Sequence, residues 1–218
     1  MSTGPSDVVG DIADEPAPHP VQARLRRFDG AKWSVVTDDV QLDADTRVLR
    51  DVVLHPGAVG IGALDAAERV VLVRQYRHPV AARLWEIPAG LLDDPTEAPW
   101  QTAMRELLEE TGLRAERWDT LLDLYASPGM SSETLRVFLA RGLSEVPVTD
   151  RPPLADEERH MVVARVPLHE LVEQIGRGAV HNALAVAGIL AAAEARRRDW
   201  QGLLPLDHPW PGPHWGVE

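Results

Sequence analysis

The sequence predicts an α/β fold in which a mixed β-sheet is covered by helices on both faces. Strand-like segments precede and follow one internal amphipathic helix, and two further helical segments stand near the C-terminus. With 218 residues, the chain can bury a sizeable core as one domain with smaller appendages.

Composition divides the chain into four parts. Residues 1–20 are rich in Pro, Asp and Gly and are predicted to be disordered. Residues 21–56 alternate β-like segments with turns, which predicts a small N-terminal β subdomain. The main domain is expected over residues 57–198. Residues 199–218 form a tail in which prolines oppose regular structure, although its tryptophans could dock on a surface.

The expected helices and strands are marked by the alternation of apolar and polar residues and by residues, such as proline, that interrupt regular structure. Strands before the internal helix are predicted at 33–36, 47–54, 58–64, 70–73 and 84–87. The polar turn 65–69 joins two of them into a buried hairpin, and Pro88 ends the last. Later strands are predicted at 118–125, 135–140 and 161–166, and helices at 168–175 and 181–197.

The internal helix is indicated by a stripe of apolar residues at helical spacing, namely Trp100, Ala103, Met104, Leu107 and Leu108. Thr96 is a candidate N-cap, and Pro99 fits only the first turn. Gly112 fits the C-terminal cap. The stripe should pack on the sheet, with the glutamates of the helix pointing away from it.

The opposite face of this helix is acidic. Glu106, Glu109 and Glu110 share one face, because residues three and four apart are neighbours on a helix. Like charges at this spacing repel, so the arrangement would not stabilise a helix that had only a structural role. A cluster of hard oxygen ligands suits Mg²⁺ or Mn²⁺. The acidic face therefore predicts a divalent metal site.

The stretch from Gly90 to Leu113 resembles the Nudix box, a glycine and a glutamate followed by R-E-U-x-E-E-x-G-U, where U is aliphatic. One extra residue separates Gly90 from Glu97, and it falls in the loop before the helix. The spacing of the three carboxylates is unchanged. The resemblance implies a Nudix α/β/α sandwich, and it implies that Glu97 pairs with Arg105.

The same resemblance implies a metal-dependent hydrolase. Two or three Mg²⁺ ions, with Mn²⁺ as a possible substitute, would be held by Glu106, Glu109, Glu110, Glu158 and the carbonyl of Ala89. Glu158, Glu110 and Arg105 form the implied catalytic set. In related enzymes a glutamate on a loop before a late strand acts as base or extra metal ligand. Here that segment contains Glu157 and Glu158, with Glu157 as the alternative, and the acid usual at position 160 is replaced by histidine.

Two segments around residues 74–90 resemble the ADP-ribose pyrophosphatase branch of the family. There, the arginine equivalent to Arg77 contacts substrate phosphate, whereas the alternative is an ordinary surface arginine. Arginine forks suit phosphate oxygens. Glu86 either supports the site or simply pairs with an arginine. Leu91, next to the box glycine, is implied to touch substrate through its backbone.

The N-terminal subdomain and a later loop supply the remaining substrate candidates. By resemblance, Arg50 reaches the substrate and Trp33 stacks on its base, although core or dimer packing explains Trp33 equally well. A proline fifteen residues after the box, here Pro128, is typical of the ADP-ribose branch. The candidates on its loop are Met130, Ser131 and Glu133.

Composition limits the function classes. The chain has 22 basic and 34 acidic residues, and a net charge of −12 makes it a poor general binder of nucleic acid. It contains no cysteine, and its longest apolar run is too short to span a membrane, so we expect a cytoplasmic protein without a membrane partner. The N-terminus does not resemble a secretory signal.

The resemblance implies hydrolysis of ADP-ribose to AMP and ribose 5-phosphate by a homodimer. Two alternatives stay open at this stage. One is a diphosphatase for another nucleotide sugar or dinucleotide on the same fold. The other is a catalytically silent domain that senses such a nucleotide, which the complete set of box glutamates disfavours.

Overall fold

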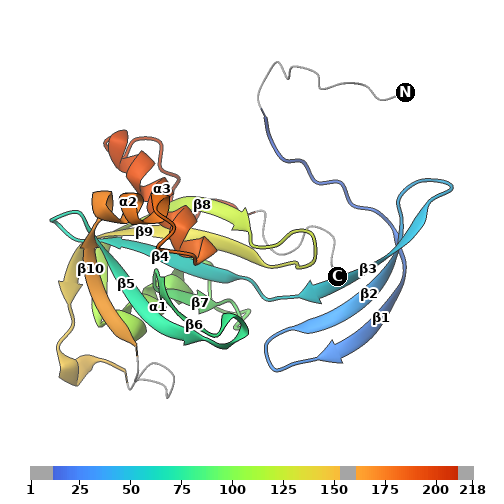
Figure 1. The fold of residues 1–218 in the computed structure, drawn as a ribbon, viewed down its shortest axis with the longest axis horizontal. Helices are drawn as coiled ribbons and strands as arrows, with labels where there is room; N and C mark the ends of the chain where they lie inside the picture. Colours follow the sequence, from blue (N-terminus) through green and yellow to red (C-terminus); the bar gives the residue numbers. More distant parts are fainter. Residues whose placement is uncertain (1–11, 153–160, 211–218) are drawn as a thin grey trace.

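The computed structural model describes residues 12–152 and 161–210 and contains two β-sheets (Figure 1). The smaller sheet has three antiparallel strands, β1 (Val21–Asp29), β2 (Ser34–Gln41) and β3 (Arg47–Leu54). In Figure 1 it extends away from the larger sheet. Residues 12–20 form neither helix nor strand.

Strand β1 was not among the predicted strands. Its sequence, VQARLRRFD, carries three arginines and is exposed over nearly its whole length, so hydrophobic alternation does not mark it. Pairing with β2 holds it instead. Arg24 donates to both carboxylate oxygens of Asp38, at 2.7 and 2.9 Å. The predicted strand at 33–36 is longer than expected, since β2 continues to Gln41.

The larger sheet has seven strands in the order β10-β5-β4-β9-β8, with β6 beside β5 and β7 beside β4. Strands β4 and β9 run parallel and the other pairs antiparallel, which confirms the predicted mixed sheet. The strands are β4 (Ala58–Leu64), β5 (Arg69–Arg77), β6 (Ala82–Glu86), β7 (Ala89–Leu91), β8 (Leu113–Tyr125), β9 (Thr134–Glu145) and β10 (Val162–Pro167). Short 3₁₀ turns lie at His78–Val80 and Val148–Asp150.

Each predicted strand of the main domain corresponds to an observed one, and only β7 is an addition. Strands β8 and β9 are longer than predicted, because they continue as a two-stranded ribbon through polar residues. Backbone pairing, which composition does not reveal, supports these extensions.

Helices cover both faces of the larger sheet, as predicted. Helix α1 (Pro99–Thr111) packs on one face, where Leu107 meets Ile61 and Phe138. Helices α2 (Leu168–Gly176) and α3 (Ala183–Arg197) pack on the other. Helix α3 was predicted to begin at residue 181, but it begins after Asn182, whose side chain accepts a hydrogen bond from the Ala185 N–H. None of these helices is both long and apolar enough to cross a bilayer.

The C-terminal segment docks on strands β8 and β9 up to Trp210. Leu204 forms a backbone bridge with Thr120. Arg136 is 3% exposed, donates to both carboxylate oxygens of Asp123 at 2.7 and 2.8 Å, and donates to the His208 carbonyl at 2.7 Å. Its guanidinium also lies 5.1 Å from the ring centre of Trp210. The second tryptophan predicted to dock, Trp215, lies outside the described residues.

The Asp123–Arg136 pair generates a stability prediction. Removal of Asp123 leaves a buried guanidinium without its carboxylate, so Asp123→Ala should lower the free energy of unfolding by about 3 kcal/mol. Urea unfolding measures the difference. Glu194→Gln, at an exposed glutamate paired with Arg197, is the control and should change little. Equal stability of both variants would contradict a structural role for the buried pair.

Candidate active site

Helix α1 is fixed at both ends by its own sequence. Pro99 occupies the first turn, as predicted, and the Gln101 side chain accepts a hydrogen bond from the Ala98 N–H at 2.8 Å. The predicted N-cap, Thr96, is wrong, because it instead donates to Asp94 in the preceding turn. At the other end, Gly112 adopts φ +69° and ends the helix as predicted.

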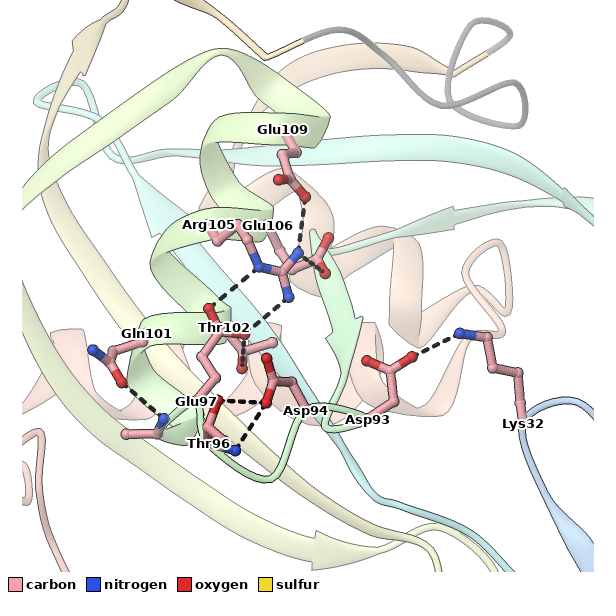
Figure 2. Close-up of polar contacts among 11 residues, drawn as sticks. Lys32, Asp93, Asp94, Thr96, Glu97, Gln101, Thr102, Arg105, Glu106 and Glu109 are labelled. Atoms are coloured by element: carbon pink, nitrogen blue, oxygen red, sulfur yellow. Dashed lines mark hydrogen bonds and ion pairs between the residues drawn. The ribbon is translucent and has the colours of Figure 1, made fainter.

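Arg105 connects the carboxylates of the helix (Figure 2). Its Nη1 donates to Glu106 Oε1 at 2.8 Å and to Glu109 Oε2 at 2.9 Å. Its Nε and Nη2 donate to the two carboxylate oxygens of Glu97, at 3.3 and 3.1 Å. The expected pairing of Glu97 with Arg105 is therefore confirmed. One guanidinium thus offsets the repulsion among three carboxylates.

These contacts alter the titration of both partners. The hydrogen bond to Glu97 is the main cause that raises the pKa of Arg105, so this side chain stays charged. The same bond is the main cause that lowers the pKa of Glu97, and a hydrogen bond donated by Thr102 adds to it. Glu97 therefore stays ionised to lower pH than an ordinary glutamate and anchors the guanidinium.

Strand β7 lies directly against the acidic face of α1. Glu110 Oε2 accepts a hydrogen bond from the Ala89 N–H at 3.1 Å. At Gly90, an added Cβ would lie 2.3 Å from Cγ and Oε1 of Glu106. Only glycine permits this approach. Glu106 and Glu110 therefore face β7, a strand of the larger sheet, so the expectation that the glutamates point away from the sheet is wrong for these two. Leu91 follows directly in the same strand.

The donor set fits a hard divalent cation. Glu106 and Glu110 both approach the β7 segment whose Ala89 carbonyl is the predicted backbone ligand, and oxygen ligands of this kind suit Mg²⁺ or Mn²⁺. Within residues 12–152 and 161–210, however, no three acidic or histidine side chains converge on one point. Arg105 binds Glu106 Oε1 and Glu109 Oε2 and so holds these two carboxylates in place.

Arg77 stands on β5 and is held by a buried acid on β6. Its Nε and Nη2 donate to the two carboxylate oxygens of Glu86 at 2.9 and 2.6 Å. Glu86 is 2% exposed, so the carboxylate forms a rigid support for the arginine. The sequence left open whether Glu86 supports the site or simply pairs with an arginine, and the structure contains the pair with Arg77.

The N-terminal substrate candidates do not meet the glutamates of α1. Trp33 is 46% exposed and packs against Phe28, with ring centres 5.5 Å apart. The side chain of Arg50 donates to the neighbouring Leu49 carbonyl at 3.3 Å. Trp33 lies in the turn between β1 and β2, and Arg50 lies on β3 of the three-stranded sheet, which Figure 1 shows extending away from the larger sheet.

The loop after β8 is pinned to the end of β3. The Met130 carbonyl accepts from the Val53 N–H at 2.9 Å, and the Ser132 N–H donates to the Val53 carbonyl at 3.0 Å. Ser131 Oγ accepts from the Glu133 N–H at 3.1 Å. Met130 is 57% exposed. The predicted substrate loop therefore presents its side chains beside the junction of the two sheets.

Sequence reasoning missed one contact between the N-terminal sheet and the loop before α1. Lys32 Nζ lies 2.6 Å from Asp93 Oδ2 (Figure 2), and this hydrogen bond is the main cause that lowers the pKa of Asp93. The two residues are 61 positions apart, so no local pattern marks the pair.

Glu158 and its alternative, Glu157, lie outside the described residues.

Comparisons with known proteins agree with this geometry. Residues 53–186 match the family model described as the NUDIX domain. The chain is 43% identical over 181 residues to ADP-ribose pyrophosphatase of Mycobacterium tuberculosis, which covers 83% of this chain and 86% of that protein. It is 34% identical over 161 residues to ADP-ribose pyrophosphatase of Bacillus subtilis, with coverages of 74% and 85%. A crystal structure described as an ADP compounds hydrolase superimposes with a TM-score of 0.72 at 19% identity, over 86% of this chain and 100% of that one.

The contact at Gly90 predicts a specific loss of metal binding. Gly90→Ala would push Glu106 away from β7, so divalent metal affinity should fall about 10- to 100-fold. The measurement is the rise in thermal unfolding temperature across a Mg²⁺ titration. Gly176→Ala is the matched control, because a Cβ there meets nothing within 4 Å. Unchanged Mg²⁺ dependence in Gly90→Ala would disprove this close-packing argument.

The lowered pKa of Glu97 predicts a pH-dependent contribution to stability. A depressed folded-state pKa stabilises the fold above the usual value of 4.5, and this contribution disappears as pH falls through the folded-state value. Glu97→Gln should therefore cost about 1 kcal/mol or less at pH 7, because Arg105 is partly exposed. Urea unfolding at pH 7 and below pH 4 measures the difference, which should shrink in acid. A difference that grows in acid would contradict the assignment.

Proposed function

The chain belongs to the NUDIX family, and on this premise we propose that it hydrolyses the pyrophosphate bond of ADP-ribose to give AMP and ribose 5-phosphate. Two relatives named ADP-ribose pyrophosphatase, at 43% and 34% identity, support this substrate. The observation that carries the proposal is the carboxylate face of α1, whose glutamates are held by Arg105 and pressed against β7.

A divalent ion at this face would neutralise the pyrophosphate and lower the pKa of a coordinated water. Glu106, Glu109, Glu110 and the Ala89 carbonyl would hold it. We propose Mg²⁺, with Mn²⁺ as a possible substitute, because the ligand set consists of hard oxygens. The contact of Glu110 with the Ala89 N–H keeps this carboxylate beside the carbonyl ligand of the same residue.

The remaining residues position the substrate and move a proton. Arg77, oriented by the buried carboxylate of Glu86, would contact the phosphates. Glu158 would accept a proton from the attacking water, and Arg105 would keep the glutamates in register. Displacement at phosphorus depends mainly on such positioning and on charge compensation.

We further propose that the enzyme acts as a homodimer in the cytoplasm. The three-stranded sheet and its β1–β2 turn expose the large apolar side chains of Leu25, Phe28, Trp33 and Leu49, with 46–67% of each accessible. A second copy packed on this sheet would cover them. It would also let Trp33 and Arg50 of one copy reach the α1 site of the other, together with Leu91, Met130, Ser131 and Glu133 at its margins.

Product analysis with a substrate panel tests the proposed function. The pure protein with Mg²⁺ is incubated with ADP-ribose, GDP-mannose, ADP-glucose, NADH and a diadenosine polyphosphate, and products are separated by ion-exchange chromatography. Conversion of ADP-ribose to AMP at the highest kcat/KM is expected. Faster turnover of another compound would keep the hydrolase assignment and reject the substrate. If no compound of the panel is hydrolysed, the result would favour a nucleotide sensor.

Substitution of one glutamate separates catalysis from folding. Glu110→Gln keeps the shape of the side chain but removes the charge, so kcat for ADP-ribose should fall at least about 100-fold. Thermal unfolding should change little. The control is Glu173→Gln, an exposed glutamate of α2 that pairs with Arg177, and it should retain full activity. Equal activity of the two variants would remove Glu110 from the mechanism.

A further inference from the structure

A cavity of about 790 Å³ lies along the β5–β6 hairpin and is lined by three arginines. Its walls include Arg74, Tyr76, Arg77, His78, Arg83 and Val162. No carboxylate of the described residues lines it. A wall with this composition is unusual in a chain of net charge −12, and it makes the cavity locally positive.

Half of the residues that line the cavity lie on the face of the sheet opposite α1, namely Arg74, Tyr76, Arg83 and Val162. Strand pairing sets Arg74 opposite Trp85 and Tyr76 opposite Arg83, so these four side chains share one face of the hairpin. Trp85 packs with the core beneath α2 and α3, which identifies the face. The neighbouring positions on each strand, which include Glu86, alternate to the other face. Gln75 and Arg77, which also line the cavity, belong to that other face. Among the described residues that line the cavity none stands on α1 or β7, so the cavity is distinct from the acidic face of α1.

Two of the arginines have no acidic partner within residues 12–152 and 161–210. Arg74 and Arg83 form no ion pair there, whereas Arg77 is bound to Glu86. The Arg74 Nε is buried without a hydrogen-bond acceptor. Its guanidinium lies 5.1 Å from the ring centre of Trp85, which holds the planar group in one orientation. A buried donor without an acceptor is costly, so Arg74 keeps this position at a cost in stability.

We propose that this cavity binds a phosphate monoester. A planar guanidinium presents paired donors that match phosphate oxygens, and Arg74 and Arg83 stand on adjacent strands. Tyr76 is 55% exposed and lies edge-on to His78, at 6.0 Å between ring centres, so an aromatic surface adjoins the positive charge. The volume is sufficient for a mononucleotide. Inorganic phosphate, a sugar phosphate and a mononucleotide share the required chemistry.

Calorimetric titration of the full chain tests the proposal without any turnover. Inorganic phosphate, ribose 5-phosphate and AMP are titrated separately at constant ionic strength with a chelator present. Loss of two charged donors in R74Q/R83Q should weaken binding at least about tenfold. The matched control is R114Q/R117Q, which removes two exposed arginines of β8 that form no ion pair within the described residues, and its affinity should stay within about twofold.

The outcomes separate the possible ligands and the possible sites. Tighter binding of AMP than of ribose 5-phosphate supports a nucleotide that uses Tyr76, whereas equal binding supports recognition of the phosphate alone. Equal affinity in R74Q/R83Q and R114Q/R117Q, or no binding by the native chain, overturns the proposal. If R74Q/R83Q does not fold, R83Q alone, at an exposed position, must still weaken binding about threefold. Since hydrolysis is not measured, failure here leaves the proposed function untouched.

Discussion

The structure depends on the compensation of like charge on helix α1. Three glutamates stand on one face of a single helix, and in isolation they would destabilise it. Arg105, anchored by Glu97, places one positive charge among Glu97, Glu106 and Glu109. This network holds the carboxylates together on one face of the helix despite their like charge. The glutamates that are proposed to carry the chemistry are therefore also the reason why the helix needs Arg105.

The sheet then holds this helix at a fixed distance from β7. Ala103 and Leu107 are fully buried against Val59 and Phe138, so α1 cannot shift without opening the core. The near-contact between Gly90 and Glu106 shows how close the two segments are. A rigid helix and a strand that pairs with β4 thus bring side-chain and backbone oxygens together. Precision at the site is a consequence of core packing.

Charge is distributed unevenly over the molecule. The chain is acidic overall, yet arginines gather along β5 and β6, on both faces of that hairpin. Arg77 forms an ion pair with the buried Glu86 on the face of the hairpin that is proposed to receive the pyrophosphate of the substrate. Arg74 and Arg83 line a cavity to which Arg77 also contributes. Local concentrations of positive charge allow an acidic protein to attract anions at selected places.

The sequence by itself determined the elements whose signals are local. The apolar stripe of α1, its cap at Gly112 and the buried runs of β4 and β5 follow from periodicity, and the carboxylate spacing follows from the helix. Tertiary structure alone decided the contacts between distant segments. Lys32 meets Asp93, Arg136 binds the C-terminal segment, and charged β1 becomes a strand because β2 supplies its partners. Such contacts depend on how the chain returns on itself in space, which no short stretch of residues encodes.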